Sequence, residues 1–247
     1  MKNRLSLLMI TKNADELLEK SLTSVIGLVD EIIIVDNYSS DKTVMIAKKF
    51  GAKIYFYKEE NLGKQRRFGL GKVSNDWVLV LDADEIISAR LRAEIKLKAK
   101  YDGFYIPFQN HFLGKQLRYG GEDYKKLILF KKNKVKIKAA LVHEKFEVIG
   151  RIGYLKNKIY HYSYRSLWQM FRKFSDYAIR EAKQKSKNGE KSSLKKIFLY
   201  PSHMFWARFI KDKGYKDGLF RIPLDLGFAY MEFLTYSTLR VYEAKLI

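Results

Sequence analysis

Cysteine is absent from this chain of 247 residues. The sequence therefore offers no disulfide framework, no cysteine-bound zinc site and no thiol nucleophile. This absence agrees with a reducing cytosol. A secretory leader is not indicated, because the apolar run near the amino terminus covers only Leu5 to Ile10 and no small-residue cleavage site follows it. We interpret this run as a first strand.

Two common nucleotide-binding motifs are also missing. No G-x-G-x-x-G sequence follows the first predicted strand, which leads instead into Thr11-Lys-Asn13. Gly71-Lys72 does not complete a P-loop, because Arg66 stands where that motif has its first glycine and Val73 where it has Ser or Thr. These absences disfavour hydride transfer and P-loop chemistry.

Acidic residues are few relative to basic ones. The chain has 48 Lys and Arg against 27 Asp and Glu, which gives a net charge of +21 at pH 7. A balance this basic favours a nucleic acid, an anionic membrane surface or an acidic substrate as partner. Apolar residues make up 47% of the chain, which is ample for a packed core. The length fits one large domain, or one domain with a substantial appendage.

The order of the predicted elements indicates the fold class. Strands and helices first alternate, with strands at 5–10, 31–37, 53–58 and 77–82 and helices at 14–26, 41–50 and 64–72. This alternation predicts βαβ units on a parallel sheet. Later strands at 103–113, 127–132, 135–138 and 156–162, with glycines between them, predict a mixed-sheet extension that closes over the site. From Ser166 onward the pattern is helical.

The predicted strand that begins at Trp77 ends in three carboxylates, Asp82, Asp84 and Glu85. Acidic groups beyond the carboxyl end of a buried strand suit a hard divalent cation, which takes oxygen ligands and often shares them with a substrate phosphate. The alternative interpretation is a helix start, with Asp82 or Asp84 as the cap and Glu85 in the first turn.

Polar residues also follow two neighbouring strands. Thr11 and Asn13 come after the first strand, and Asp36 comes after the second. Because the carboxyl ends of parallel strands meet at one edge, we expect these residues beside Asp82 and Asp84. There an acid can accept hydrogen bonds from a nucleoside, and a carboxylate pair can hold the metal of its diphosphate. Asp36 alone could equally be a turn residue that leads into the next helix, but the three sets together favour a nucleotide site.

Four segments together resemble glycosyltransferase family 2: Thr11 to Asn13, Ile34 to Thr43, Asn61 to Arg67 and Leu81 to Glu85. The resemblance implies the GT-A fold, which is a Rossmann-like, mostly parallel α/β sheet with a mixed-sheet extension. Here a helical C-terminal region follows it. The segments Val142-His-Glu144 and His161 to Ser166 are similar to a narrower group, the lipopolysaccharide-core β-1,4-glucosyltransferases of the WaaE type.

The resemblance implies an inverting transfer of a hexose from a nucleotide-diphospho-sugar, with UDP-glucose as the expected donor. The acceptor would be a sugar hydroxyl of lipopolysaccharide core or of another surface glycan. Asp84 would be the main ligand of Mg²⁺ or Mn²⁺, and Asp82 would contact the ribose or the metal. Asp36 would bind the nucleobase, in a pocket that Thr11, Asn13 and Ser39 also line.

A third matching segment is assigned to the same donor. Gly63 would allow close approach of the backbone, and Lys64 and Arg67 would lie near the donor. Many relatives continue this segment with Ala-x-Asn, whereas this chain has Arg67-Phe-Gly69. The contacts of Lys64 and Arg67 therefore stay open.

The attacking hydroxyl needs a general base, and Glu122-Asp123 is the candidate pair. It resembles the acidic position that follows the metal motif in related enzymes, with Asp123 preferred and Glu122 as the alternative. Either could instead be a turn acid or a partner for nearby lysines.

Further candidates lie later in the chain. His143 could complete the metal shell or touch the diphosphate, although a structural histidine is the alternative. Glu144 could hold His143 or contact the acceptor, and Arg165 could bind phosphate or lie at the surface. His161, in a tyrosine-rich stretch, ranks behind His143.

The carboxyl-terminal region carries most of the excess charge. Between Arg151 and Arg221 there are eighteen Lys or Arg against five Asp or Glu. Residues 222–244 could span a bilayer by length, but their charges argue against it. These charges fall on one helical stripe, so the apolar remainder should lie in a membrane interface, a core or a partner. Residues 198–210 are similarly rich in aromatic residues.

We therefore expect a GT-A domain at 1–165, with a donor half at 1–100 and an acceptor half at 101–165. Residues 166–247 would form a basic, amphipathic helical region for membrane association or homodimerisation. The expected location is cytoplasmic, on the inner face of the plasma membrane. Two alternatives are a sugar nucleotidyltransferase, which would want a phosphate loop after the first strand, and a nucleic-acid-binding protein. Nucleic acid is not expected as a partner, because buried strands that end in acids would repel phosphates.

Overall fold

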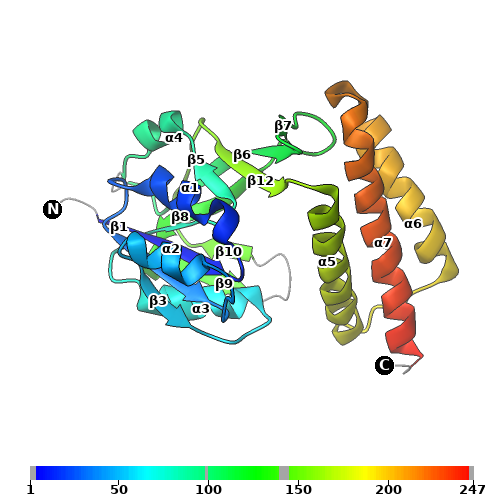
Figure 1. Cartoon of the computed structure of the whole chain (residues 1–247), viewed down its shortest axis with the longest axis horizontal. Coiled ribbons are helices and arrows are strands. Elements are labelled where there is room, and N and C mark those ends of the chain that lie inside the picture. The colour runs from blue at the N-terminus through cyan, green and yellow to red at the C-terminus, as the bar shows by residue number, and fades with distance from the viewer. Residues whose placement is uncertain (1–3, 98–99, 139–144, 245–247) are drawn as a thin grey trace. The chain divides into compact units, whose positions relative to one another are not determined.

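A computed structural model describes residues 4–97, 100–138 and 145–244 (Figure 1). The chain divides into two compact units. The first unit comprises Met1–Phe108 and Tyr124–His161, and the second comprises Gln109–Asp123 and Tyr162–Ile247. The expected division at residue 165 differs from this one, because Gln109–Asp123 groups with the helices.

Strands and helices alternate through the first part of the first unit. These elements are β1 (Leu5–Thr11), α1 (Asp15–Val25), β2 (Glu31–Asp36), α2 (Thr43–Lys49), β3 (Lys53–Phe56), α3 (Leu62–Lys72) and β4 (Trp77–Val80). Strand β1 pairs in parallel with β2 and β4, and β2 pairs in parallel with β3. Strands β1, β2 and β4 are apolar and largely buried on both faces, as Ile33, Ile34 and Val35 are in β2, whereas the edge strand β3 is partly exposed. The predicted parallel α/β sheet is confirmed.

The sheet becomes mixed after β4. The further elements are β5 (Glu85–Ile87), α4 (Ala89–Glu94), β6 (Gly103–Phe112), β7 (Lys115–Gln116), β8 (Lys125–Lys131), η1 (Lys132–Lys134), β9 (Val135–Lys138), β10 (Lys145–Val148), β11 (Ile152–Tyr154) and β12 (Ile159–Tyr164). The main sheet has the order β3-β2-β1-β4-β8-β6-β12-β5, with β7 and β11 on β6, and β9 pairs with β10 separately. Strand β8 is antiparallel to β4 and β6. The predicted mixed-sheet extension is therefore also confirmed.

The alternative in which Glu85 starts a helix is wrong. Glu85 begins strand β5, in which it pairs with His161 of β12. The next helix, α4, begins four residues later, and the Ser88 side chain accepts a hydrogen bond from the Leu91 amide at its start. A long-range strand pairing decides the conformation here, and no local pattern reveals it.

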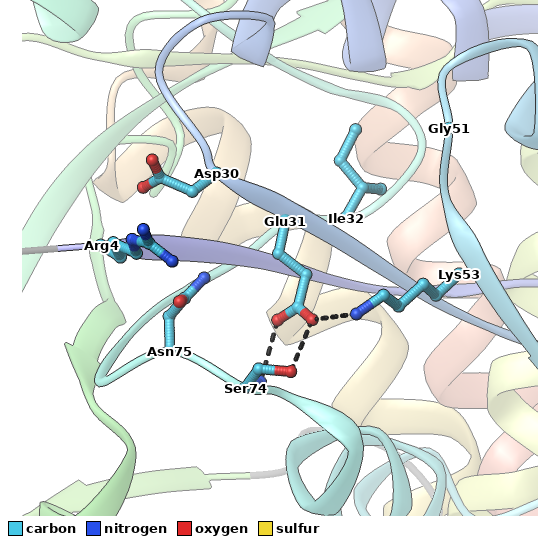
Figure 2. Close-up of a pocket in the computed structure, with 8 residues that line it drawn as sticks. All are labelled: Arg4, Asp30, Glu31, Ile32, Gly51, Lys53, Ser74 and Asn75. Atoms are coloured by element: carbon cyan, nitrogen blue, oxygen red, sulfur yellow. Dashed lines mark hydrogen bonds and ion pairs between the residues drawn. The ribbon is translucent and has the colours of Figure 1, made fainter.

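The amino ends of the strands carry a surface pocket of about 280 Å³ (Figure 2). The Glu31 carboxylate there accepts hydrogen bonds from the Ser6 hydroxyl at 2.7 Å, the Lys53 ammonium at 2.9 Å, and the amide and hydroxyl of Ser74 at 2.9 and 2.8 Å. Burial raises the pKa of Glu31, but these hydrogen bonds outweigh burial and hold that pKa at about 2 instead of 4.5. Glu31 therefore ties β1, β2, β3 and the segment before β4 together.

The second unit is helical. Besides β7 its elements are α5 (Leu167–Lys187), α6 (Leu194–Trp206), the π-helical turn η2 (Ala207–Lys211), the 3₁₀ turns η3 (Gly214–Asp217) and η4 (Leu219–Arg221), and α7 (Ile222–Glu243). Helix α7 packs against both α5 and α6 (Figure 1), and its Leu224, Tyr236 and Leu239 are buried. Of the environments considered for this apolar helix, the core of its own unit is the one observed. No helix in the described part of the chain is both long and apolar enough to cross a membrane.

Candidate active site

The loops after β1 and β2 are joined by hydrogen bonds at the carboxyl edge of the sheet. Thr11 pairs with Asp36 in register. The Asn13 amide donates to the Ser39 hydroxyl at 2.8 Å, and the Asn13 side-chain oxygen accepts from the Ser40 amide at 2.8 Å. Asn13 has a φ of 49°, which is uncommon for a residue other than glycine. The two loops therefore hold each other in a defined shape.

Asp36 lies buried beneath these two loops. Its carboxylate accepts hydrogen bonds from the hydroxyls of Thr11 and Ser39 at 2.8 and 2.6 Å, and from the Ser39 amide at 2.7 Å. Its side chain is completely buried. A direct contact between Asp36 and a nucleobase would therefore require Ser39 to move. Tyr38, two residues after Asp36, is exposed, and its ring centroid lies 5.5 Å from that of Phe56.

Asp82, Asp84 and Glu85 follow β4 at the same edge of the sheet. The Leu81 amide donates to the Leu8 carbonyl at 3.2 Å and so continues the pairing with β1 to the residue before Asp82. The Glu85 amide donates to the Asp82 carbonyl at 3.0 Å, and the Asp82 amide donates to the Glu85 carboxylate at 3.0 Å. This tight turn leaves the Asp82 side chain 37% exposed and the Glu85 side chain only 3% exposed. Asp82 can reach a ligand, whereas Glu85 supports the turn from within.

Each of these acids faces a basic group of the first unit. Arg66 Nη2 lies 2.7 Å from Asp82 Oδ1, and Lys126 Nζ lies 3.2 Å from Glu85 Oε1. His161 Nε2 lies 3.4 Å from Asp84 Oδ1. We call these six residues the acid–base cluster.

The charges in the acid–base cluster shift one another's pKa values. Burial raises the pKa of Asp82, but Arg66 and Lys126 outweigh it and hold that pKa below its usual value. Burial is the main cause that raises the pKa of Glu85. Burial lowers the pKa of His161, but Asp84 outweighs it and raises that pKa above its usual value. Asp82 is therefore ionised at neutral pH and can act as an oxygen ligand.

The acid–base cluster fits a divalent cation that is shared with a substrate phosphate. Across residues 4–97, 100–138 and 145–244, no group of three or more His, Asp or Glu is arranged to hold a metal alone. Mg²⁺ and similar ions often take one or two carboxylates and complete their shell with phosphate and water oxygens. Asp82 and Asp84 are hard oxygen donors that are not fully buried. They suit this mode of binding.

The predicted donor residues of α3 are placed differently from one another. Gly63 is buried in the first turn of α3, behind the cap that Asn61 makes with the Lys64 amide. Lys64 Nζ lies 3.3 Å from a Glu59 carboxylate oxygen. The Arg67 guanidinium donates to the Ile137 carbonyl at 2.7 Å. Of the charged residues of this segment, Arg66 is the one that reaches the acids after β4.

The predicted base pair Glu122-Asp123 lies in the second unit. Glu122 is buried, and its carboxylate accepts hydrogen bonds from Asn110 at 2.6 Å, from Arg221 at 3.1 Å and from Arg208. Asp123 is exposed. The Glu122 carboxylate is therefore buried and hydrogen-bonded within the second unit, and Asp123 is the acid of this pair that faces solvent.

Arg221 fixes the loop that precedes these acids. Its fully buried guanidinium donates to the carbonyls of Tyr119 and Gly120 at 2.7 and 3.0 Å, and it pairs with Asp217 and Asp225 at 2.9 Å. Gly120 has a φ of 68°, and a side chain there would overlap the Arg221 guanidinium. The sequence of Tyr119 to Asp123 is thus matched to one buried arginine.

The remaining predicted residues are placed as follows. His143 and Glu144 lie outside the described residues. Arg165 lies in the second unit just before α5, where its amide donates to the Gln169 side chain at 3.0 Å. Arg165 belongs to the second unit, whereas the acid–base cluster belongs to the first.

Sequence reasoning missed Arg66 and Lys126 and ranked His161 too low. Gly63, Arg66 and Gly69 recur at every third position of α3 and are all buried, so helical periodicity could have placed Arg66 on the face toward the sheet. His161 reaches Asp84 because β12 pairs with β5. No local signal reveals that pairing or the approach of Lys126 to Glu85.

Known proteins resemble this chain in sequence and in fold. Residues 6–160 match the family described as Glycosyl transferase family 2. Uncharacterised glycosyltransferases of Rickettsia typhi and Rickettsia prowazekii are each 29% identical to it over 98% of the chain and 88% of their own length. The crystal structure of S. aureus TarS residues 1–349 in complex with UDP-GlcNAc covers 98% of this chain and 92% of that one, with a TM-score of 0.51 and 13% identity.

The family match covers the features that the structure brings to one edge of the sheet. It includes β1, β2, α3 and β4, with Asp36, Asp82 and Asp84 at or beyond their carboxyl ends, and it stops before the helices of the second unit. The TarS likeness supports the same fold. The chain belongs to glycosyl transferase family 2.

Proposed function

We propose that this protein transfers a hexose, with inversion, from UDP-glucose to a sugar hydroxyl of lipopolysaccharide core or another surface glycan. The observation that carries the proposal is that the loops around Asp36 and the acid–base cluster lie at the same edge of the sheet. The joined loops around Asp36 offer polar groups for a nucleoside, and the acid–base cluster offers ligands for the metal of its diphosphate. The UDP-GlcNAc bound to TarS, which shares the fold, agrees with a UDP-sugar donor.

The loops after β1 and β2 would hold the nucleoside. Asn13 and Ser39 carry polar groups there, and the Asp36 carboxylate fixes Ser39 through two hydrogen bonds. Tyr38 is exposed beside them and offers a ring face to the nucleobase. In this assignment Asp36 first fixes the shape of the two loops. It contacts the nucleobase only after the Ser39 side chain has moved away from its carboxylate.

Asp84 and Asp82 would hold Mg²⁺ or Mn²⁺, which as a Lewis acid neutralises the charge that develops on the departing diphosphate. His161 positions Asp84, and Arg66 positions Asp82. Lys126 keeps the buried Glu85 paired, so the turn from Asp82 to Glu85 is held in one geometry. Lys64 and Arg67, at the surface of α3, would lie near the donor.

Asp123 would accept the proton of the attacking hydroxyl. Inversion needs a base on the side of the sugar opposite to the leaving group, and the exposed carboxylate of Asp123 is available for this role. Glu122 is assigned instead to holding the loop, because two guanidinium groups occupy it. The roles proposed for His143 and Glu144, at the metal or the acceptor, and for Arg165, at a phosphate, rest on the sequence alone.

The proposed acceptor implies where in the cell the protein works. Lipopolysaccharide core and lipid-linked glycans reside at a membrane, so we propose that the protein works in the cytoplasm on the inner face of the plasma membrane. The net charge of +21 supports attraction to such an anionic surface. A homodimer is the alternative use of the helical region.

Transfer from UDP-glucose, assayed with Mn²⁺ or Mg²⁺ and a lipopolysaccharide-core acceptor, tests the proposal together with UDP-induced thermal stabilisation. Asp84→Asn should abolish transfer and metal-dependent stabilisation by UDP, whereas Asp76→Asn, at an exposed site at the amino end of β4, should preserve both. Asp123→Asn should lose transfer by at least about a hundredfold but keep the response to UDP. Normal turnover by Asp123→Asn would refute the base assignment, and no response of the wild type to any sugar nucleotide would refute the donor site.

A further inference from the structure

Helix α6 exposes an apolar face. The large apolar side chains on it are between 47% and 74% exposed: Leu194, Phe198, Leu199, Trp206 and, in η2, Ile210. At about 100° per residue, Phe198, Leu199 and Trp206 fall within an arc of about 100°. We call these five residues the α6 outer face. Exposure of so many large side chains on one helix is unusual for a surface that meets only water.

The opposite side of α6 is already used for packing. Ile197 is buried with Tyr236 and Leu239 of α7, and the Tyr200 ring meets the Tyr236 ring edge-on at 5.2 Å. Helix α6 lies along α7 in Figure 1. The α6 outer face is therefore not needed for the core of the second unit.

Basic residues predominate around the α6 outer face, and one exposed acid, Asp212, lies between Lys211 and Lys213 just beyond its end. No acidic residue occurs from Leu194 to Lys211. Lys195 is exposed within the same arc, and Lys191, Lys211 and Lys213 are exposed just beyond the two ends. An apolar and aromatic stripe bordered by lysines is the composition of helices that lie in a membrane interface, where each basic residue near an anionic surface contributes about 1 kcal/mol.

We propose that the α6 outer face inserts into the headgroup region of an anionic lipid bilayer. Trp206 and Phe198 would enter the boundary between headgroups and acyl chains, and Lys195 would stay at the level of the lipid phosphates. A second copy of this chain fits the same face less well. A symmetric dimer would bring the lysines around the two faces together without an acid on α6 to pair with them.

This inference gives a surface to the membrane association within the proposed function, but it does not depend on the transfer chemistry. None of the five residues belongs to the candidate active site. Vesicle binding and UDP-induced thermal stabilisation therefore report separately on the two proposals.

The test is flotation of the full chain with vesicles of phosphatidylcholine alone and of phosphatidylcholine mixed equally with phosphatidylglycerol. We expect binding to the anionic vesicles that weakens as salt is raised. Trp206→Ser and Phe198→Ser should each reduce the partition coefficient by about tenfold, the loss expected from one large apolar side chain. Trp168→Ser is the matched control, because Trp168 is an exposed tryptophan on α5 and its loss should leave vesicle binding unchanged.

Each outcome bears on the proposal. Unchanged far-UV circular dichroism of the α6 variants would show that the helices of the second unit are still folded, so that loss of flotation reports on the surface. Equal losses with Trp168→Ser and Trp206→Ser would overturn the assignment to α6. Failure of the wild type to bind either kind of vesicle would also overturn it. In that case a dimer seen by light scattering, and lost in Trp206→Ser, would assign the face to a second copy.

Discussion

Replacing Glu31 by glutamine should destabilise the first unit at neutral pH and destabilise it much less in acid. The Glu31 carboxylate joins three strands through hydrogen bonds from Ser6, Lys53 and Ser74, of which Figure 2 shows those from Lys53 and Ser74. Those bonds hold its pKa at about 2, against 4.5 for an ordinary glutamate. A carboxyl whose pKa is lower in the folded state stabilises that state only where the unfolded chain is also ionised.

The size of the effect follows from the difference in pKa. At about 1.4 kcal/mol for each pKa unit, the lowering from 4.5 to about 2 means that the Glu31 carboxylate contributes at most about 3.5 kcal/mol to the free energy of unfolding. The Glu31 side chain is only 7% exposed, so little of this is lost to solvent, whereas Lys53 is 59% exposed and contributes little as an ion pair. The stabilisation is complete above about pH 5 and is lost as the pH falls from about 4.5 toward 2.

Urea unfolding at about pH 7 and about pH 3 measures this contribution. Trp77 is the only one of the three tryptophans in the first unit, so fluorescence in a Trp168→Phe, Trp206→Phe background follows that unit alone. The difference between Glu31 and its glutamine variant should approach about 3.5 kcal/mol at about pH 7 and shrink to less than half of that at about pH 3. Glu19→Gln, at an exposed site of α1, is the control. A difference that does not change with pH would refute the reasoning.

Three further variants test the contacts described above. Arg221→Lys should lower the unfolding free energy of the second unit by about 3 kcal/mol, and should lower kcat while leaving the KM for the donor unchanged; denaturation and steady-state kinetics measure both. Gly120→Ala should destabilise by more than Gly51→Ala in urea unfolding, because the two glycines have similar positive φ but only Gly120 lies against Arg221. Arg66→Gln should lower the Tm without metal and should gain more Tm from Mn²⁺ than the wild type does, because Asp82 loses its competing cation; calorimetry measures this.

The alternation of strands and helices could be predicted from sequence because it depends on local patterns. The run from Ile32 to Val35 is apolar and β-branched, and this composition favours a buried strand. The same patterns placed Thr11, Asp36 and Asp82 at the ends of neighbouring parallel strands. Their arrangement at one edge then followed from the geometry of βαβ units, and β1 does lie between β2 and β4.

The partners of the acids could not be predicted in the same way. Glu85 and His161 are 76 positions apart and meet because β5 pairs with β12. Arg221 is 99 positions from Glu122, and its burial depends on how η4 and α7 pack within the second unit. A single sequence does not show which distant basic residue pairs with which acid, because any lysine or arginine could form an ion pair with a given carboxylate.

The balance of charge in the acid–base cluster implies that metal and donor bind together. Three acids there face Arg66, Lys126 and His161, so a basic side chain already lies against each acid. A divalent cation alone would add uncompensated positive charge, and a diphosphate alone would meet Asp82 and Asp84. Together their charges largely cancel, so each should raise the affinity for the other by the same factor. On the proposed function, Mn²⁺ should therefore bind at least about tenfold more tightly with UDP present. Calorimetric titrations of Mn²⁺ with and without UDP that showed no coupling would exclude a shared site.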